Sequence, residues 1–226
     1  MTWAMQPAEP IGGVRQRIER FFRKAGGPAL STDQEWKAYV MSMLLFNAIM
    51  FIVVYAILSL QAILPLNPDA KSAIEPSLIF HTVASFVTNT NPQHYSGEVS
   101  MSYFSQLFGL MWLQFVSAAT GIAALSALAR GLAGKRALGN FYRDLMRATF
   151  LVLLPMASGL ALLLVLGGVP MTLQGAAVAK TLEGAMQTIA RGPVAALEAI
   201  KQLGTNGGGF FGPNSAHPFE NPSCFT

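Results

Sequence analysis

The strongest feature of the hydrophobic pattern is that three long stretches of the chain lack charged residues. Residues 38–68, 99–129 and 148–179 contain no Asp, Glu, Lys or Arg. An apolar helix crosses a bilayer with about 20 residues, and each stretch is longer than that. The pattern therefore predicts an all-α polytopic membrane protein. Its spans are expected at about residues 38–60, 102–129 and 148–169.

Two shorter apolar stretches, Pro76–Val87 and Pro193–Leu203, are too short to span a bilayer and predict re-entrant helices. A polar loop follows each of them, and each loop contains a Thr-Asn pair, at Thr88-Asn89 and Thr205-Asn206. The order of span, re-entrant helix, filter loop and span thus occurs once in full. It then recurs without its last span.

Composition supports the membrane class, because 52% of the residues are hydrophobic and only 12% are charged. The net charge is +4, but the basic residues gather before the first span and between the second and third. This distribution predicts that residues 1–37 and 130–147 are cytoplasmic and that 61–100 and 170–226 face outward. The positive charge is therefore explained by topology, and no nucleic-acid partner is expected.

An amphipathic helix is predicted near Val14–Lys24, where Ile18, Phe21 and Phe22 share one face. Two interpretations remain open for this segment. The apolar face lies on the membrane surface, or the segment is a solvated basic tail.

The two loops have the chemistry of an ion filter. Neither Thr88–Asn91 nor Gly204–Gly209 contains an acidic residue, so the available ligands are neutral carbonyl and hydroxyl oxygens. Such ligands replace the hydration shell of a monovalent cation, whereas calcium and magnesium call for carboxylates. The C-terminal end of a re-entrant helix carries partial negative charge, which also favours a cation.

The glycine run admits a rival interpretation, since Gly207-x-Gly209-x-x-Gly212 matches the dinucleotide fingerprint. That motif opens a helix after a strand, and Pro213 and Pro218 oppose a helix here. No Lys-Ser or Lys-Thr pair follows the glycines, which argues against a Walker loop.

Two His and Glu pairs, His94 with Glu98 and His217 with Glu220, raise the question of a metal site. Pro218 prevents the second pair from sharing a helical face, and no third ligand is close in the sequence. We therefore expect both pairs to stabilise their loops through backbone hydrogen bonds.

Two long signatures resemble a known family. Ser85–Asn91, with Gln93, Tyr95–Glu98 and Tyr103–Gln106, is similar to the first filter region of the potassium-binding subunit of the bacterial potassium-transporting (Kdp) P-type ATPase. Gly204–Phe211 with Asn214–Pro222 resembles its second filter region. The similarity runs from about residue 33 to Pro222. Pro92 departs from the pattern, because an aromatic residue often occupies that position in the family.

The resemblance implies a potassium-binding and translocating subunit of an ATP-driven uptake system in the bacterial inner membrane. Potassium is the expected substrate, and no cofactor or catalytic residue is expected on this chain. ATP hydrolysis is expected on a partner P-type subunit, together with a small accessory subunit and membrane lipid. The residues that the resemblance assigns to the filter are Thr88, Asn89, Thr90, Asn91, Gln93, Gly204, Thr205, Asn206, Gly207 and Gly208.

The expected organisation is a cytoplasmic segment (1–37), a first pore-type repeat (38–129), a cytoplasmic loop (130–147) and a second repeat lacking its last span (148–226). The resembled family has four such repeats and an additional N-terminal span. The chain is therefore expected to be a truncated form with one and a half repeats. Two alternatives remain: a nonfunctional membrane fragment, and a channel-like potassium transporter subunit without a pump.

Overall fold

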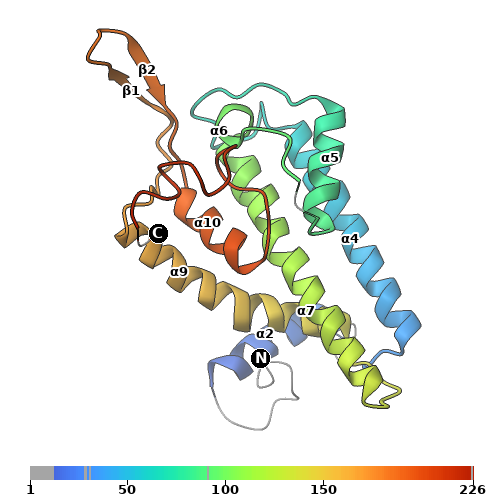
Figure 1. Cartoon of the computed structure of the whole chain (residues 1–226). Coiled ribbons are helices and arrows are strands. Elements are labelled where there is room, and N and C mark those ends of the chain that lie inside the picture. Colours follow the sequence, from blue (N-terminus) through green and yellow to red (C-terminus); the bar gives the residue numbers. More distant parts are fainter. Residues whose placement is uncertain (1–12, 28–29, 31, 91, 225) are drawn as a thin grey trace. The chain divides into compact units, whose positions relative to one another are not determined.

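A computed structural model describes residues 13–27, 30, 32–90, 92–224 and 226 of the chain (Figure 1). By packing, these residues divide into two compact units. The first comprises Met1–Ile49 and Ala118–Pro155, and the second comprises Met50–Ser117 and Met156–Thr226. Each unit draws on both of the repeats expected from the sequence. The predicted site residue Asn91 lies outside the described residues.

The described part of the chain is mostly helical and contains three helices long and apolar enough to cross a membrane. The first is α4 (Trp36–Ser59). The second, over Ser105–Leu132, consists of the π-helical turn η1 (Ser105–Met111) and α7 (Trp112–Leu132). The third, over Phe141–Leu166, consists of α8 (Phe141–Arg147), η2 (Ala148–Leu153) and α9 (Leu154–Leu166). The predicted helical membrane class is confirmed.

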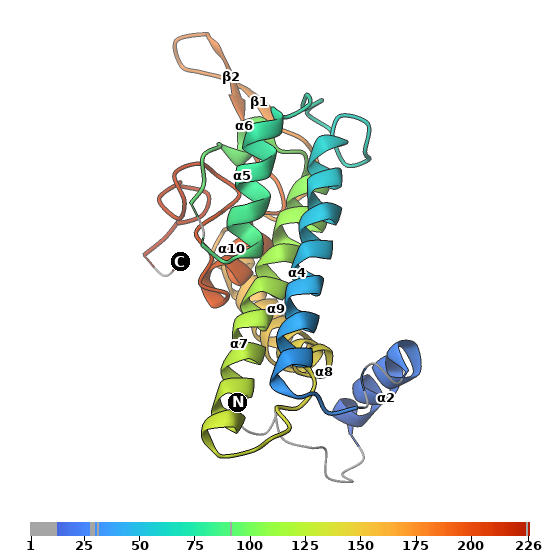
Figure 2. The same cartoon turned by 90° about the vertical axis from the view of Figure 1, so that its right-hand side faces the viewer.

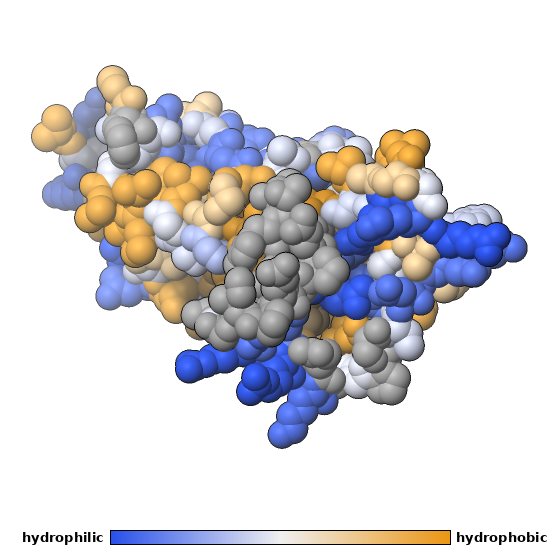
Figure 3. All heavy atoms as spheres, turned by 90° about the horizontal axis from the view of Figure 1, so that it is seen from below, coloured by the Kyte–Doolittle hydropathy of each residue, from blue (hydrophilic) through white to orange (hydrophobic). Residues whose placement is uncertain are grey.

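Helix α4 is apolar on all sides, which is typical of a helix surrounded by lipid or by other membrane helices. Its large side chains are exposed on more than one face, as Val40 and Val53 show, since a helix of 100° per residue separates them by about 140°. The space-filling view from below shows hydrophobic areas beside projecting hydrophilic side chains on the surface of the protein (Figure 3).

The two π-helical turns were not predicted. Pro155 is the second residue of α9, which begins directly after η2. Proline has no N–H to donate, and its ring crowds the carbonyl four residues earlier. A widened turn before Pro155 relieves that crowding, so the distortion takes the form of a π-helical turn.

The short helix α5 spans Pro76–Val87, as the sequence predicted. Its start is fixed by Glu75, whose carboxylate accepts a hydrogen bond from the Leu78 amide at 3.0 Å. The Ser77 hydroxyl also donates to this carboxylate, and that hydrogen bond lowers the pKa of Glu75. Helix α5 lies along the second half of α4 (Figure 2), where the Phe51 and Phe80 ring centroids are 5.4 Å apart.

A second short helix, α10 (Val194–Leu203), occupies the other stretch for which a re-entrant helix was predicted. The C-terminal segment loops over it (Figure 1). Between α9 and α10 the structure adds a feature that the sequence analysis missed. Strands β1 (Ala177–Lys180) and β2 (Met186–Ile189) pair antiparallel, with Ala177 opposite Ile189 and Lys180 opposite Met186. Gly184, at φ +90°, allows the tight turn between them.

In the first unit, α2 (Val14–Gly26) confirms the predicted N-terminal helix, but its apolar residues do not share one environment. Phe22 packs on Phe150, with ring centroids 4.9 Å apart. Phe21 is instead 67% exposed.

The two segments expected in the cytoplasm meet in the first unit. The Gln34 amide donates to the Gly139 carbonyl at 2.6 Å, and the Leu138 amide donates back to the Gln34 carbonyl at 2.9 Å. The Asn140 side chain reaches the Thr32 carbonyl at 2.9 Å. These bonds join the segment before α4 to the segment before α8.

Candidate ion-binding loops

The loop after α5 is closed by a defined set of backbone hydrogen bonds. The Asn89 amide donates to the Phe86 carbonyl at 3.3 Å, and the Thr90 amide donates to the Ser85 carbonyl at 3.0 Å. Asn89 has a left-handed backbone with φ of 54°. These are the features of a Schellman motif, which caps a helix and reverses the chain.

The loop after α10 repeats the motif. The Thr205 amide donates to the Gln202 carbonyl at 3.3 Å, and the Asn206 amide donates to the Lys201 carbonyl at 2.9 Å. Thr205 also has φ of 54°. Asn89 and Thr205, 116 residues apart, are therefore the equivalent positions. The sequence comparison had paired Thr88 with Thr205, because each is the threonine of a Thr-Asn pair. In the structure the residue equivalent to Thr205 is Asn89, so that pairing is shifted by one residue.

The left-handed backbone conformation costs less free energy in the first loop than in the second. Asparagine adopts this conformation with little strain, whereas a β-branched residue there is an outlier. Glycine is the usual choice at this position of the motif, yet Gly204 lies one residue before it and the strained position is held by Thr205. Such strain occurs preferentially at functional sites.

The two loops are bonded to each other through Asn89. Its Nδ2 atom donates to the Gly204 carbonyl at 3.3 Å and lies 3.4 Å from the Thr205 hydroxyl. The Asn89 Oδ1 atom accepts a hydrogen bond from the Ser117 hydroxyl of α7 at 3.4 Å. The structure therefore brings together two predicted filter segments that are far apart in the sequence.

A second contact between the loops comes from Gln93, whose Oε1 atom accepts a hydrogen bond from the Gly209 amide at 3.0 Å. Behind the glycine run, the Gln114 side chain donates to the Gly208 carbonyl at 2.6 Å. The Asn206 side chain donates to the Gln114 carbonyl at 3.3 Å. The amide oxygens Gln114 Oε1 and Asn206 Oδ1 are buried and accept no hydrogen bond from the described residues, so the loop is backed by oxygen acceptors.

The predicted filter residues differ in exposure. Gly204, Asn206 and Gly208 are buried, while Asn89, Gln93 and Gly207 are half-buried. Thr88, Thr90 and Thr205 are exposed. The Thr88 and Thr90 hydroxyls are 2.5 Å apart, which presents two oxygens together at the surface of the first loop.

Gly208 is required by close packing. A Cβ atom at this position would collide with the Phe86 ring of α5, and Phe86 is only 2% exposed. The neighbouring Gly207 carbonyl accepts a hydrogen bond from the Asn214 side chain. The glycine run is thus pressed against the first short helix on one side and hydrogen-bonded to the C-terminal segment on the other.

Both glutamates accept hydrogen bonds from backbone amides, as expected, but Glu98 stabilises the second loop instead of its own. Glu98 accepts a hydrogen bond from the Gly212 amide at 2.9 Å. Glu220 accepts hydrogen bonds from the Phe211 amide at 3.2 Å and the Ser215 amide at 2.5 Å. Since Gln93, Glu98 and Glu220 accept hydrogen bonds from amides after Gly208, that part of the run is fixed in position.

The two histidines contribute in different ways. His217 Nδ1 accepts a hydrogen bond from the Phe219 amide at 3.1 Å, which agrees with the predicted backbone role. His94 instead stacks on His81, with ring centroids 4.1 Å apart. Among the described residues, no group of three or more His, Cys, Asp or Glu side chains is placed to hold a metal ion.

The sequence analysis missed a buried charge cluster beneath the glycine run. Lys201 is 2% exposed, and its ammonium pairs with Glu198 and with Glu220, the latter at 3.3 Å. Glu198 precedes Lys201 by three residues in α10, which was the available signal. The partner Glu220 lies 19 residues from Lys201, so sequence spacing does not reveal this pairing.

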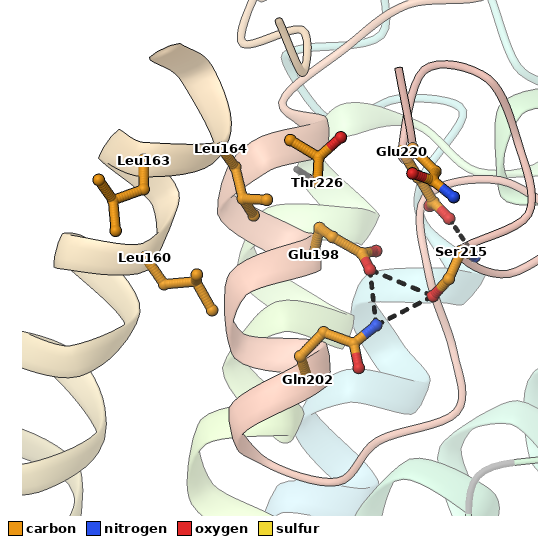
Figure 4. A pocket seen from close by; sticks show the side chains of 9 residues that line it. Leu160, Leu163, Leu164, Glu198, Gln202, Ser215, Glu220 and Thr226 are labelled. Carbon is orange, nitrogen blue, oxygen red and sulfur yellow. Dashed lines mark hydrogen bonds between the residues drawn. The ribbon is translucent and has the colours of Figure 1, made fainter. Parts of the chain in front are cut away.

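A cavity of about 300 Å³ lies between α9 and α10 in the second unit (Figure 4). Leucines of α9 form its apolar side, and Figure 4 shows polar side chains of α10 and the C-terminal segment on the other side. Gln202 donates to Glu198 at 2.7 Å and to Ser215 at 3.0 Å, while Ser215 donates to Glu198 at 3.1 Å. This network fixes α10 to the segment after the glycines.

Tyr103 supports the same region from the start of the second span. Its side chain is buried, and its hydroxyl donates a hydrogen bond to the Arg191 carbonyl. The ring lies 6.1 Å from that of Phe210, between ring centroids. Tyr103 thereby joins the segment before α10 to the end of the glycine run.

Together, the apolar helices and the paired loops define a helical membrane protein with a candidate site built from backbone and neutral side chains. The family model described as potassium-transporting ATPase A subunit matches residues 1–226. The chain belongs to this family.

Curated relatives agree with the family match, and each is named a potassium-transporting ATPase potassium-binding subunit. The relative from Alicyclobacillus acidocaldarius is 56% identical over 92% of this chain, and the one from Granulibacter bethesdensis is 52% identical over 92%. The relative from Mesorhizobium japonicum is 51% identical over 97%. The chain spans 38%, 37% and 39% of the length of these relatives, respectively.

Proposed function

We propose that the two loops form part of a potassium-binding filter, and that the chain acts within the potassium-binding subunit of an ATP-driven uptake system. The observation that carries the proposal is the matched pair of Schellman loops bonded to each other through Asn89. Two equivalent loops at the ends of two short helices are what a filter made from repeated pore segments requires.

The chemistry of the loops favours a cation. Helices α5 and α10 both direct their C-terminal ends at the loops, and those ends carry partial negative charge. The Thr88 and Thr90 hydroxyls add oxygen ligands, and the oxygens of Gln114 and Asn206 enrich the second loop in acceptors. Neutral ligands suit a weakly hydrated monovalent ion such as potassium better than a divalent ion.

The proposed filter residues are those of the two loops and Gln93. Asn89 and Gln93 hold one loop against the other, while the threonines and the glycine backbone surround the ion. We place the filter on the outward side of a bacterial inner membrane, in pore-type repeats over 38–129 and 148–226. ATP hydrolysis is assigned to a partner P-type subunit, and a small accessory subunit completes the complex.

The proposal is tested with Gly207→Ala and Gly207→Asp in a full-length relative that carries these loops. A Cβ or carboxylate in a backbone-lined filter alters the ion path. We expect weaker potassium uptake or weaker discrimination against sodium, with normal membrane insertion.

The matched control is Gly159→Ala in α9, where an added Cβ meets no atom within 4 Å. It should leave the potassium affinity unchanged. Unchanged affinity and selectivity in both Gly207 variants would overturn the filter assignment.

A further inference from the structure

Helix α2 presents two faces with different chemistry. At about 100° per residue, Arg17, Arg20, Phe21 and Lys24 fall within an arc of about 100°. All four side chains are exposed, and Phe21 is 67% exposed. Glu19 and Phe22 lie on the opposite side, where they contact the third apolar helix. The exposed face therefore combines three cationic side chains with one aromatic ring.

The contacts of the buried face fix the level of α2 relative to the membrane. Arg147 pairs with Glu19 at 2.9 Å, and both side chains are largely buried. Arg147 is the last charged residue before the uncharged run 148–179. Phe22 packs on Phe150, three residues into that run. Helix α2 therefore lies where the third apolar helix passes from charged to uncharged sequence, which is the level of lipid headgroups.

We propose that the face formed by Arg17, Arg20, Phe21 and Lys24 binds the headgroups of anionic phospholipids. The guanidinium and ammonium groups donate charge-assisted hydrogen bonds to phosphate oxygens. The Phe21 ring enters the boundary between headgroups and acyl chains, as aromatic residues of interfacial helices do. The inference rests on α2 and its contacts, and it is independent of what the loops bind.

The position of the face favours lipid over an acidic protein. A basic surface on a soluble region would suit either partner, but this one is held beside a membrane-entering helix by a salt bridge and a ring contact. Basic side chains within a Debye length of a membrane are attracted to its anionic lipids. An exposed aromatic ring among them gains a nonpolar environment only by partial insertion.

The test is hydrogen–deuterium exchange of the 226-residue chain in two kinds of nanodisc. One contains phosphatidylcholine alone, and the other contains phosphatidylcholine with phosphatidylglycerol. We expect the amides of α2 to exchange several-fold more slowly with phosphatidylglycerol at low salt, and high salt should reduce the difference. Slow exchange within α4 in both preparations shows that the chain is folded.

A matched pair of variants assigns the effect to the face. Arg17→Gln with Lys24→Gln should abolish the lipid-dependent protection of α2. Lys135→Gln with Arg136→Gln removes the same charge from exposed loop positions and should preserve it. Equal exchange of α2 in the two lipids, or equal loss of protection in both double variants, would overturn the proposal. Protection that an acidic peptide confers in phosphatidylcholine alone would assign the face to a protein partner and would also overturn it.

Discussion

Asn89 and Thr205 have the same left-handed backbone, each at φ of 54°, and the Asn89 Nδ2 atom lies 3.4 Å from the Thr205 hydroxyl. The residue that reverses the chain after one short helix thus touches its counterpart after the other. Because the two positions are in contact, a change of backbone in either loop alters the surroundings of the other. The conformation of the proposed filter is therefore a joint property of both loops.

Replacing Thr205 with glycine should relieve strain. A non-glycine residue in the left-handed region costs about 1–3 kcal/mol, and a β-branched one is especially unfavourable. We expect Thr205→Gly to stabilise the chain by about 1 kcal/mol, which raises the apparent Tm by about 2–4 °C for a chain of this size. Thermal unfolding in one detergent measures this change.

The equivalent change in the first loop provides the control. Asn89→Gly relieves less strain, because asparagine tolerates the left-handed region, and it removes the bonds to Gly204 and Ser117. It should lower the Tm. A lower Tm in Thr205→Gly would show that the hydroxyl contributes more than the strain costs.

Sequence reasoning located the elements well because their signals are local. Uncharged runs longer than a bilayer crossing gave the three apolar helices, and the turn residues around Pro76–Val87 gave α5. It failed at the π-helical turns and the strand pair Ala177–Lys180 with Met186–Ile189. Those features depend on how neighbouring turns pack against each other, and the spacing of hydrophobic residues carries no information about that packing.

The sequence predicted which segments form the candidate site. It did not predict which positions of the two loops are equivalent, or that charged side chains are buried beneath the glycine run. The Thr-Asn letters suggested a pairing, yet the backbone equivalence begins at Asn89 and Thr205. The ion pair between Lys201 and Glu220 joins α10 to a loop beyond the glycines. A tertiary contact of this kind cannot be predicted from residue spacing, whereas the pairing of Glu198 with Lys201, three residues apart in one helix, can.

The contact between Gly208 and Phe86 predicts a strong and specific coupling. Gly208→Ala places a methyl group into the buried Phe86 ring, and overpacking of this kind costs about 1–3 kcal/mol. We expect a lower Tm for Gly208→Ala and partial recovery when Phe86→Leu is added, because the smaller side chain leaves room. A double-mutant cycle of unfolding free energies measures the coupling.

The control for this cycle is Gly121→Ala in α7, where the added Cβ meets no atom within 4 Å. Alanine is favoured over glycine in a helix by about 0.5–1 kcal/mol, so this variant should be neutral or stabilising. Additive effects of Gly208→Ala and Phe86→Leu would argue against the packing described here.

The predicted topology places Lys135 in the cytoplasm and the strand pair outside. Leu182, at the turn between the strands, is fully exposed, and it is a better reporter than Lys71, which is bonded to the Glu98 carbonyl at 2.7 Å. In a Cys224→Ser background, an impermeant thiol reagent applied to intact cells should label Leu182→Cys and spare Lys135→Cys. Labelling of both, or of Lys135→Cys alone, would contradict the topology.

The buried cluster of Glu198, Lys201 and Glu220 should respond very differently to the loss of one charge and to the loss of all three. Lys201→Met leaves two buried carboxylates without their cation, and removing one partner of a buried ion pair costs about 3–5 kcal/mol. The triple variant Glu198→Gln, Lys201→Met and Glu220→Gln removes every charge while keeping the side-chain volumes. The Phe211 and Ser215 amides donate to different oxygens of Glu220, so Glu220→Gln keeps one of these two hydrogen bonds and loses the other. We therefore expect a large fall in Tm for Lys201→Met and a much smaller one for the triple variant. Equal losses would mean that the ammonium of Lys201 contributes mainly through the packing of its aliphatic stem, and the cluster would then not be what holds the glycine run in place.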